Sequence, residues 1–181
     1  SVPRMWQGQT VAILASGPSM SSEVADRVRD AQIPTIAINT TFRLAPWAAM
    51  LYAADGRWWS HYEKEATAFQ GLKVTCSDEV RLPGLLHLRE TGREGFDSNP
   101  SFIRTGGNSG YQAIHIAMQA GAARVLLFGM DMHSTLHWHG KHPEPLRNAG
   151  SGIYARWLKR FETLKPEAAR LGVEIQNCTP G

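Results

Sequence analysis

The sequence predicts an α/β protein with a single doubly wound, mostly parallel sheet and helices on both of its faces, a Rossmann-like fold. Short apolar runs alternate with segments of helical period along most of the chain, which is typical of a parallel sheet. The runs are apolar throughout, as expected of strands that are buried on both faces. Polar residues follow several of these runs directly, at the position where ligands bind in such sheets.

The first strand–helix–strand unit lies in residues 10–38. Residues 10–15 (TVAILA) and 34–38 (PTIAI) are short, apolar and rich in β-branched side chains, so both are predicted strands. Between them, residues 21–29 begin with serines that can cap a helix and continue with apolar positions at helical spacing. A third strand is expected at 49–54 and a second helix at 57–68.

The rest of the chain continues the alternation around a long polar segment. Residues 89–105 (RETGREGFDSNPSFIRT) carry Gly, Pro and charge without a period, which predicts a loop or a lid over a site. The other expected elements are weaker strands at 72–75 and 85–88, a strong helix at 108–121, a strand at 124–128, a long amphipathic helix at 153–171 and a final strand at 173–175. Pro166 should bend or shorten that last helix, because proline removes a backbone donor.

Length and composition indicate one domain, residues 1–181, with the lid at 89–105 and a histidine-rich loop at 132–148. Apolar residues make up 43% and charged residues 19% of the chain, as in soluble globular proteins. No window approaches the ~20 apolar residues that cross a bilayer, and SVPRMWQGQ is no signal peptide, so a cytoplasmic protein without a membrane span is expected. The net charge of +3 comes from scattered Lys and Arg residues, which does not favour nucleic-acid binding.

The first candidate site follows the first strand. In Ser16-Gly17-Pro18-Ser19 a buried strand turns at once toward a helix, and the backbone N–H groups of such a turn can hold an anion. The turn lacks the GK[ST] of a Walker A loop and does not match GxGxxG. Taken alone, it is equally well interpreted as a plain tight turn or as a phosphate loop.

A second turn of the same kind precedes the helix expected at 108–121. Arg104, Gly107, Asn108, Ser109 and Gly110 lie in the segment RTGGNSG, whose glycines let a ligand approach the backbone in front of a helix N-terminus. Two such turns beside one sheet edge favour a diphosphate or a nucleotide as the ligand.

Other residues could contact a base or a sugar. Asn39 ends the second predicted strand and Asp55 the third, and either side chain can hydrogen-bond ligand hydroxyls. Asp55 can also bind a metal ion, and both residues can instead cap or turn the chain. Trp58, Trp59 and Trp138 are candidates for a stacking surface, with core packing as the alternative.

The histidine-rich loop is the main candidate for chemistry. Asp131 ends the strand at 124–128, and His133, His137, His139 and His142 follow it closely, four of the seven histidines. This density suits either a zinc or other transition-metal site or acid–base chemistry at neutral pH. The spacing matches no standard ligand pattern such as HExxH, and a solvated loop is the further alternative.

These motifs resemble a known superfamily. A strand ending in GPSM, the strands ending in Asn39 and Asp55, and NSGYQAIHIAMQAGAARVLLFGMD resemble the Rossmann-type superfamily that contains bacterial CMP-sialic-acid sialyltransferases and 6-hydroxymethylpterin diphosphokinase-like proteins. The likeness covers residues 10–60 and 104–132. The loop HWHGKHPEPLRN and the tail GVEIQNCTPG look like those of phage-encoded relatives, which implies the host cytoplasm as the location.

The resemblance also implies roles for individual residues. By likeness to the sialyltransferases, Gly17, Pro18, Ser19, Ser109 and Gly110 contact the nucleotide phosphate and sugar, and Asn39 contacts the nucleotide. A histidine downstream of Asp131 acts as base, and the resemblance does not fix it among His133, His137, His139 and His142. The chain departs from those enzymes in being shorter and in lacking their lid with its paired tyrosines.

The leading hypothesis is therefore a glycosyltransferase-like enzyme that uses a nucleotide or nucleotide sugar. Two helix N-termini and Arg104 would hold the phosphate leaving group while a loop histidine deprotonates an acceptor hydroxyl. A metal is not required; where one is, Asp55 and Asp131 are the natural ligands. The alternatives are a pterin-type diphosphokinase with ATP and Mg²⁺, a zinc hydrolase, and a non-catalytic binding or assembly protein of a phage.

Overall fold

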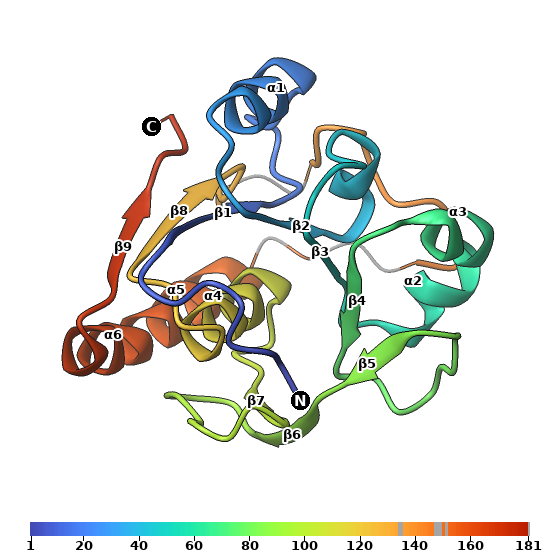
Figure 1. Cartoon of the computed structure of the whole chain (residues 1–181). Helices are drawn as coiled ribbons and strands as arrows, with labels where there is room; N and C mark the ends of the chain where they lie inside the picture. Colours follow the sequence, from blue (N-terminus) through green and yellow to red (C-terminus); the bar gives the residue numbers. More distant parts are fainter. Residues whose placement is uncertain (134–135, 147–149, 151, 181) are drawn as a thin grey trace.

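A seven-stranded parallel sheet forms the centre of the molecule (Figure 1). The computed structural model describes residues 1–133, 136–146, 150 and 152–180. From one edge to the other, the strands are β5 (Leu85–His87), β4 (Leu72–Thr75), β3 (Met50–Tyr52), β2 (Thr35–Ile38), β1 (Thr10–Leu14), β8 (Arg124–Phe128) and β9 (Glu174–Asn177). Every neighbouring pair is parallel, so the predicted α/β fold with a parallel sheet is confirmed.

The strand order reverses beside β1. From β1 the chain builds outward to β5 on one side, and β8 then returns to the other side of β1. In the register of this central pair, Leu14 lies opposite Phe128, so the two strands end at the same level. Parallel sheets bind ligands where the order reverses, outside the carboxyl ends of the strands. The residues that follow Leu14 and Phe128 therefore stand at the expected position of a site.

Helices cover both faces of the sheet, because successive strand residues point to opposite sides. On one face, Ala12 and Leu14 pack with α1 (Ser22–Asp30) and with the aromatic residues of α2 (Gly56–His61). On the other face, Val11 and Ile13 pack with α4 (Ser109–Gln119) and α6 (Lys165–Leu171). All four strand side chains are fully buried, which explains why the strands are apolar throughout.

Two expected helices are divided in the structure. The helix expected at 57–68 consists of α2 and α3 (Glu63–Ala68), which meet at Tyr62. The helix expected at 153–171 consists of α5 (Ile153–Phe161), a 3₁₀ turn η2 (Glu162–Leu164) and α6. Pro166 lies in the first turn of α6, where its missing N–H costs no helical hydrogen bond, so the predicted interruption is confirmed. A second 3₁₀ segment, η1 (Asn39–Arg43), follows β2.

Residues 89–105 are not the irregular lid that the sequence predicted. They contain β6 (Arg89–Gly92) and β7 (Phe102–Arg104), which pair as a separate two-stranded parallel sheet. This sheet is fastened to α4: the Asp97 N–H donates to His115 Nε2 at 2.9 Å, and Gln119 Nε2 donates to the carbonyl of Phe102 at 2.9 Å. The prediction failed because these hydrogen bonds to α4, the next helix in the chain, order the segment, and no periodic pattern within the segment reveals them.

No helix in the described part of the chain combines the length and the apolar character needed to cross a bilayer.

Candidate functional site

A cavity of about 480 Å³ lies at the carboxyl end of the sheet, where the strand order reverses. Ser16 follows β1, Asn39 follows β2, Asp55 follows β3 and Asp131 follows β8, and all four line this cavity. The expectation that these strand ends meet at one edge is thus confirmed.

The cavity collects most of the predicted site residues but not all of them. Those that line it are Ser16, Gly17, Pro18, Asn39, Asp55, Gly107, Asn108, Ser109, Gly110, Asp131, His137 and His142. Ser19, Arg104, His133 and His139 do not line it.

The turn after β1 is closed by the protein's own groups. The Gly17 N–H donates to the Gly129 carbonyl at 2.8 Å. Asp131 Oδ2 accepts the Ser19 hydroxyl at 2.9 Å and the Ser19 N–H at 3.3 Å. Of the two interpretations of this turn, these contacts favour the plain tight turn, because the N–H groups of Gly17 and Ser19 already have acceptors within the protein. Ser19 joins the β1 and β8 loops.

Gly17 is required by how closely these two loops pack. A Cβ atom built at this position would overlap the Asp131 carboxylate and the Gly129 carbonyl oxygen. Only the absence of a side chain lets the strand ends approach to hydrogen-bonding distance. The glycine of the SGPS motif is therefore explained by strand packing.

The second glycine turn keeps its predicted relation to the cavity. Asn108 caps α4, and its Oδ1 accepts the N–H groups of Gly110 at 2.7 Å and Tyr111 at 3.2 Å. The N–H groups of Gly107 and Ser109 make no hydrogen bond to any described residue. Because Gly107 has a φ of +70°, glycine suits this position better than any other residue. The N-terminus of α4 thus presents two free donors and the Ser109 side chain to the cavity.

Arg104 precedes this turn in the chain but does not line the cavity. It lies on β7, where its Nε is 3.9 Å from Asp97 Oδ2, and a Cβ on Gly92 would touch its guanidinium. The cation beside the turn is Arg160 of α5, whose Nη1 donates to the Gly106 carbonyl at 2.9 Å. The expected phosphate-binding role of Arg104 does not fit this position.

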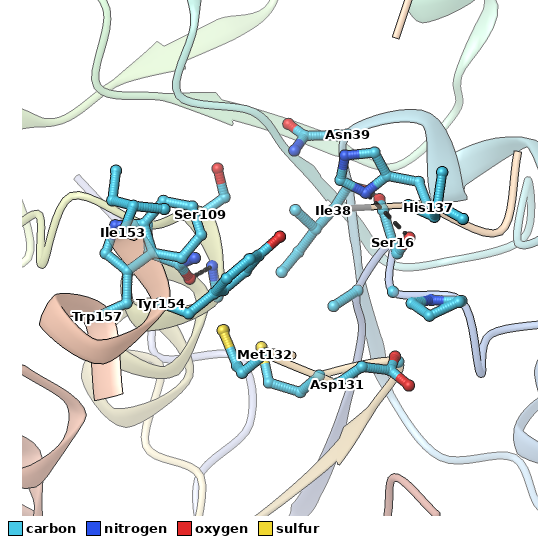
Figure 2. A pocket seen from close by; sticks show the side chains of 18 of the residues that line it. Ser16, Ile38, Asn39, Ser109, Asp131, Met132, His137, Ile153, Tyr154 and Trp157 are labelled. Atoms are coloured by element: carbon cyan, nitrogen blue, oxygen red, sulfur yellow. Dashed lines mark hydrogen bonds between the residues drawn. The ribbon is translucent and has the colours of Figure 1, made fainter. Parts of the chain in front are cut away.

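The histidine loop is docked onto the end of β1. Trp138 donates its backbone N–H to the Ser16 carbonyl at 3.1 Å and its Nε1–H to Thr41 Oγ1 at 3.1 Å. Thr41 Oγ1 in turn lies 2.9 Å from Ser16 Oγ. His137 Nδ1 lies 3.2 Å from the Ser16 carbonyl, a contact drawn as a dashed line in Figure 2. These bonds hold the histidines against the cavity wall.

Three loop histidines form a cluster, His137, His139 and His142. The ring centroids of His137 and His139 are 5.2 Å apart and nearly parallel, and His142 lies 4.5 Å from the first and 5.0 Å from the second. Burial lowers the pKa of His139 and of His142 to about 4, with the neighbouring His137 acting in the same direction. Burial also lowers the pKa of His137. All three rings are therefore neutral at pH 7.

His133 stands apart from the cluster. Its side chain is 69% exposed, and its Nε2 is 4.0 Å from Asp131 Oδ1 on the solvent side. It does not line the cavity, which makes the expected role as base a poor fit for this histidine.

The aromatic wall of the cavity comes from α5. Tyr154 and Trp157 line it, with their rings 5.4 Å apart at 85° (Figure 2). Trp58 and Trp59, which the sequence made stacking candidates, lie in the core, where Trp59 Nε1 donates to the Ala53 carbonyl at 2.9 Å. The sequence signal for this wall was a pair of aromatic residues, Tyr154 and Trp157, three positions apart in a helix. In the structure none of the described residues of that helix is buried.

Two residues of the cavity wall hold unusual backbone angles. Asn39 has a φ of 50° and Met132 a φ of 54°, in the left-handed region. Asparagine adopts this conformation readily, whereas methionine does so at a cost. Such angles in non-glycine residues are common at functional sites, but Gln32, with a φ of 56°, has one in the turn between α1 and β2, outside the cavity.

The chain matches no protein-family model and no curated protein. The likeness to the sialyltransferase and pterin diphosphokinase superfamily therefore consists of the quoted motifs. The fold by itself does not select among the many functions found on Rossmann-like sheets.

The charges around the cavity limit what it can bind. Among its described lining residues are two carboxylates, Asp55 and Asp131, and no lysine or arginine. Asp55 also caps α2 by accepting the Arg57 N–H at 2.9 Å. An anionic group is therefore best accommodated at the α4 N-terminus, on the side that Ser109 occupies in Figure 2. The opposite side, with His137, suits a group that exchanges a proton or binds a metal.

Proposed function

We propose that the protein is a nucleotide-dependent transferase that moves a glycosyl group from a nucleotide sugar to an acceptor hydroxyl. The observation that carries this proposal is that the α4 N-terminus and His137 lie on opposite sides of one cavity (Figure 2). A transferase needs both parts: one that stabilises the departing phosphate and one that activates the acceptor.

The phosphate end of the donor is assigned to the turn before α4. The free N–H groups of Gly107 and Ser109, the Ser109 hydroxyl and the helix dipole all favour negative charge there. As the sugar–phosphate bond breaks, charge develops on the phosphate oxygens. Donors fixed in advance at this point stabilise the transition state by an amount on the order of a few kcal/mol.

The nucleoside or sugar end is assigned to the aromatic wall. Trp157 lies beside the α4 turn, since its Nε1 is 3.7 Å from the position of a Cβ added to Gly107. A ring that stacks on these side chains keeps its phosphate within reach of Gly107 and Ser109. The side-chain amide of Asn39, on the opposite wall, is placed to bind a ligand hydroxyl.

The acceptor hydroxyl is assigned to the histidine side. His137 and His142 line the cavity and are neutral at pH 7, the form that can receive a proton. Asp131 has no part in this step, because its carboxylate is engaged by Ser19.

Thermal denaturation with nucleotides tests the proposal. CMP, UDP or GDP, or one of their sugars, should raise the melting temperature of the protein, and Ser109→Ala should reduce that increase. The matched control is Ser21→Ala, which removes a helix-capping serine of α1 outside the cavity. If no nucleotide stabilises the protein, or if both variants respond alike, the proposed function is wrong.

One observation favours a second candidate, pyrophosphate transfer from ATP. The cavity has two carboxylates and, among its described lining residues, no lysine or arginine to balance a triphosphate. Mg²⁺ on Asp55 would supply that charge, since Mg²⁺ prefers carboxylate oxygens. Stabilisation by ATP only when Mg²⁺ is present, with no response to nucleotide sugars, would select this candidate.

A further inference from the structure

Three imidazole rings meet at the edge of the cavity, which His137 and His142 line and His139 does not. The ligand atoms of His137, His139 and His142 all lie within 4.8 Å of one another. A tetrahedral zinc ion with Zn–N bonds of about 2.1 Å needs nitrogen–nitrogen separations of about 3.4 Å. The rings must therefore close by at most about 1.4 Å, which side-chain rotation provides.

The backbone of the loop directs two of these rings to the same side. His137 and Gly140 form a tight turn, in which the Gly140 N–H donates to the His137 carbonyl at 2.9 Å. His139 lies inside this turn, between the two paired residues, and its ring stacks beside that of His137 at an interplanar angle of 13°. His142 reaches the same point from beyond the turn.

A backbone carbonyl orients the first ring. His137 Nδ1 lies 3.2 Å from the Ser16 carbonyl oxygen, and since a carbonyl only accepts, the hydrogen is on Nδ1. The lone pair is therefore on Nε2. Metal-binding histidines are held in this way, with the second ring nitrogen donating to a carbonyl or carboxylate.

The second ring has an unused nitrogen. His139 Nε2 is buried and has no hydrogen-bond partner among the described residues. Buried polar atoms without a partner are rare in folded proteins, so this nitrogen indicates a position where an ion or a water molecule binds. Neutral imidazole nitrogens are ligands for zinc, copper, nickel or iron, whereas Mg²⁺ selects oxygen.

We propose that His137, His139 and His142 bind one divalent transition-metal ion, with Zn²⁺ as the best fit, and leave one coordination position open toward the cavity. The open position follows from the ligand count, because three protein nitrogens leave the fourth tetrahedral position to a water or a substrate. His137 and His142 line the cavity, so that position faces it.

The ion would also activate the acceptor hydroxyl. This step rests on the proposed transferase function. A hydroxyl oxygen bound at the open position would have a lowered pKa and would release its proton to water in the cavity, as zinc-bound water does. In the metal-bound protein this route would replace direct proton transfer to His137 or His142, because their free nitrogens would bind the ion.

Metal titration of tag-free, chelator-treated protein tests the site without any nucleotide. Zn²⁺ should bind with a stoichiometry of one in isothermal titration calorimetry, and Co²⁺ should give the intense visible absorption of a four-coordinate site. His139→Ala should weaken Zn²⁺ binding at least about 100-fold. His133→Ala is the matched control, because this exposed histidine of the same loop lies outside the cluster, and it should bind Zn²⁺ like the wild type.

Three outcomes would overturn the metal site: no stoichiometric binding, an octahedral Co²⁺ spectrum, or equal Zn²⁺ affinity in the His139→Ala and His133→Ala variants. His142→Asn gives a second test, and circular dichroism of each metal-free variant shows whether it folds. Failure here is distinct from failure of the proposed function, since nucleotide stabilisation is measured on metal-free protein. A protein that binds Zn²⁺ but no nucleotide keeps this site and loses the transferase proposal.

Discussion

Asp131 accepts two hydrogen bonds from Ser19, from its hydroxyl at 2.9 Å and from its backbone N–H at 3.3 Å. The two residues are separated by 112 positions in the chain, and their contact joins the loops that follow β1 and β8. The Asp131 side chain is only 5% exposed. Its carboxylate is therefore a negative charge held within the protein where the strand order reverses, and it disfavours the binding of an anionic ligand close to it.

Replacing this carboxylate should weaken the fold more than it weakens ligand binding. Asp131→Asn keeps the shape but loses the charge of the acceptor, so we expect the free energy of unfolding to fall by about 1–2 kcal/mol. Urea denaturation measures this change. Asp30→Asn, at an exposed residue of α1, should change it by less than about 0.5 kcal/mol. An Asp131→Asn protein of normal stability would show that the contact has no structural role.

The same loop contact makes Gly17 sensitive to the smallest substitution. In Gly17→Ala the added Cβ overlaps the Gly129 carbonyl, and this backbone atom cannot move aside without disturbing β8. We expect a loss of roughly 2 kcal/mol or more in the free energy of unfolding. Gly152→Ala is the control, because an added Cβ there meets no atom within 4 Å. Similar melting temperatures for the two variants would contradict the close packing.

Acid should destabilise the protein through His115. This ring is fully buried in α4, and burial lowers its pKa from 6.5 to about 4. The unfolded chain then binds more protons than the folded protein between these values, so stability is full above pH 6.5 and falls as the pH drops toward 4. The total loss from this group is roughly 3 kcal/mol.

A variant isolates this contribution. In His115→Gln, an amide oxygen replaces Nε2 as acceptor of the Asp97 N–H, and no titrating group remains at the position. The free energy of unfolding, measured from pH 7 to pH 4, should decline less steeply than in the wild type. His87→Gln, at an exposed histidine, should leave the wild-type slope unchanged. Parallel curves for His115→Gln and the wild type would refute the assignment.

Much of this architecture could be predicted from local patterns. The strands at 10–15, 34–38 and 124–128 are recognisable because both faces of the sheet are covered, so apolar residues follow one another instead of alternating with polar ones. Asn39, Asp55 and Asp131 could then be placed at one edge, since parallel strands end together.

The residues that the sequence misplaced are those whose partners are distant in the chain. The N–H groups of Gly17 and Ser19 in the SGPS turn are bound by Gly129 and Asp131, which no local pattern reveals. Trp58, for which core packing was the alternative to stacking, lies in the core, and its Nε1 donates to Thr40 Oγ1 at 3.3 Å. Periodicity also cannot show that three of the four loop histidines converge while His133 stays outside, because a loop has no period.

The aromatic wall offers a direct test of where a nucleotide would lie. Trp157 lines the cavity and neighbours Gly107, so a base or sugar ring on its face keeps its phosphate at the α4 N-terminus. Trp157→Ala should therefore weaken nucleotide binding by about 10-fold, since stacking on an aromatic side chain contributes ~1–3 kcal/mol. Leu158→Ala, at a half-exposed neighbour on the same helix, should bind like the wild type. Equal dissociation constants for the two variants in a fluorescence titration would show that the nucleotide does not stack on Trp157 of α5.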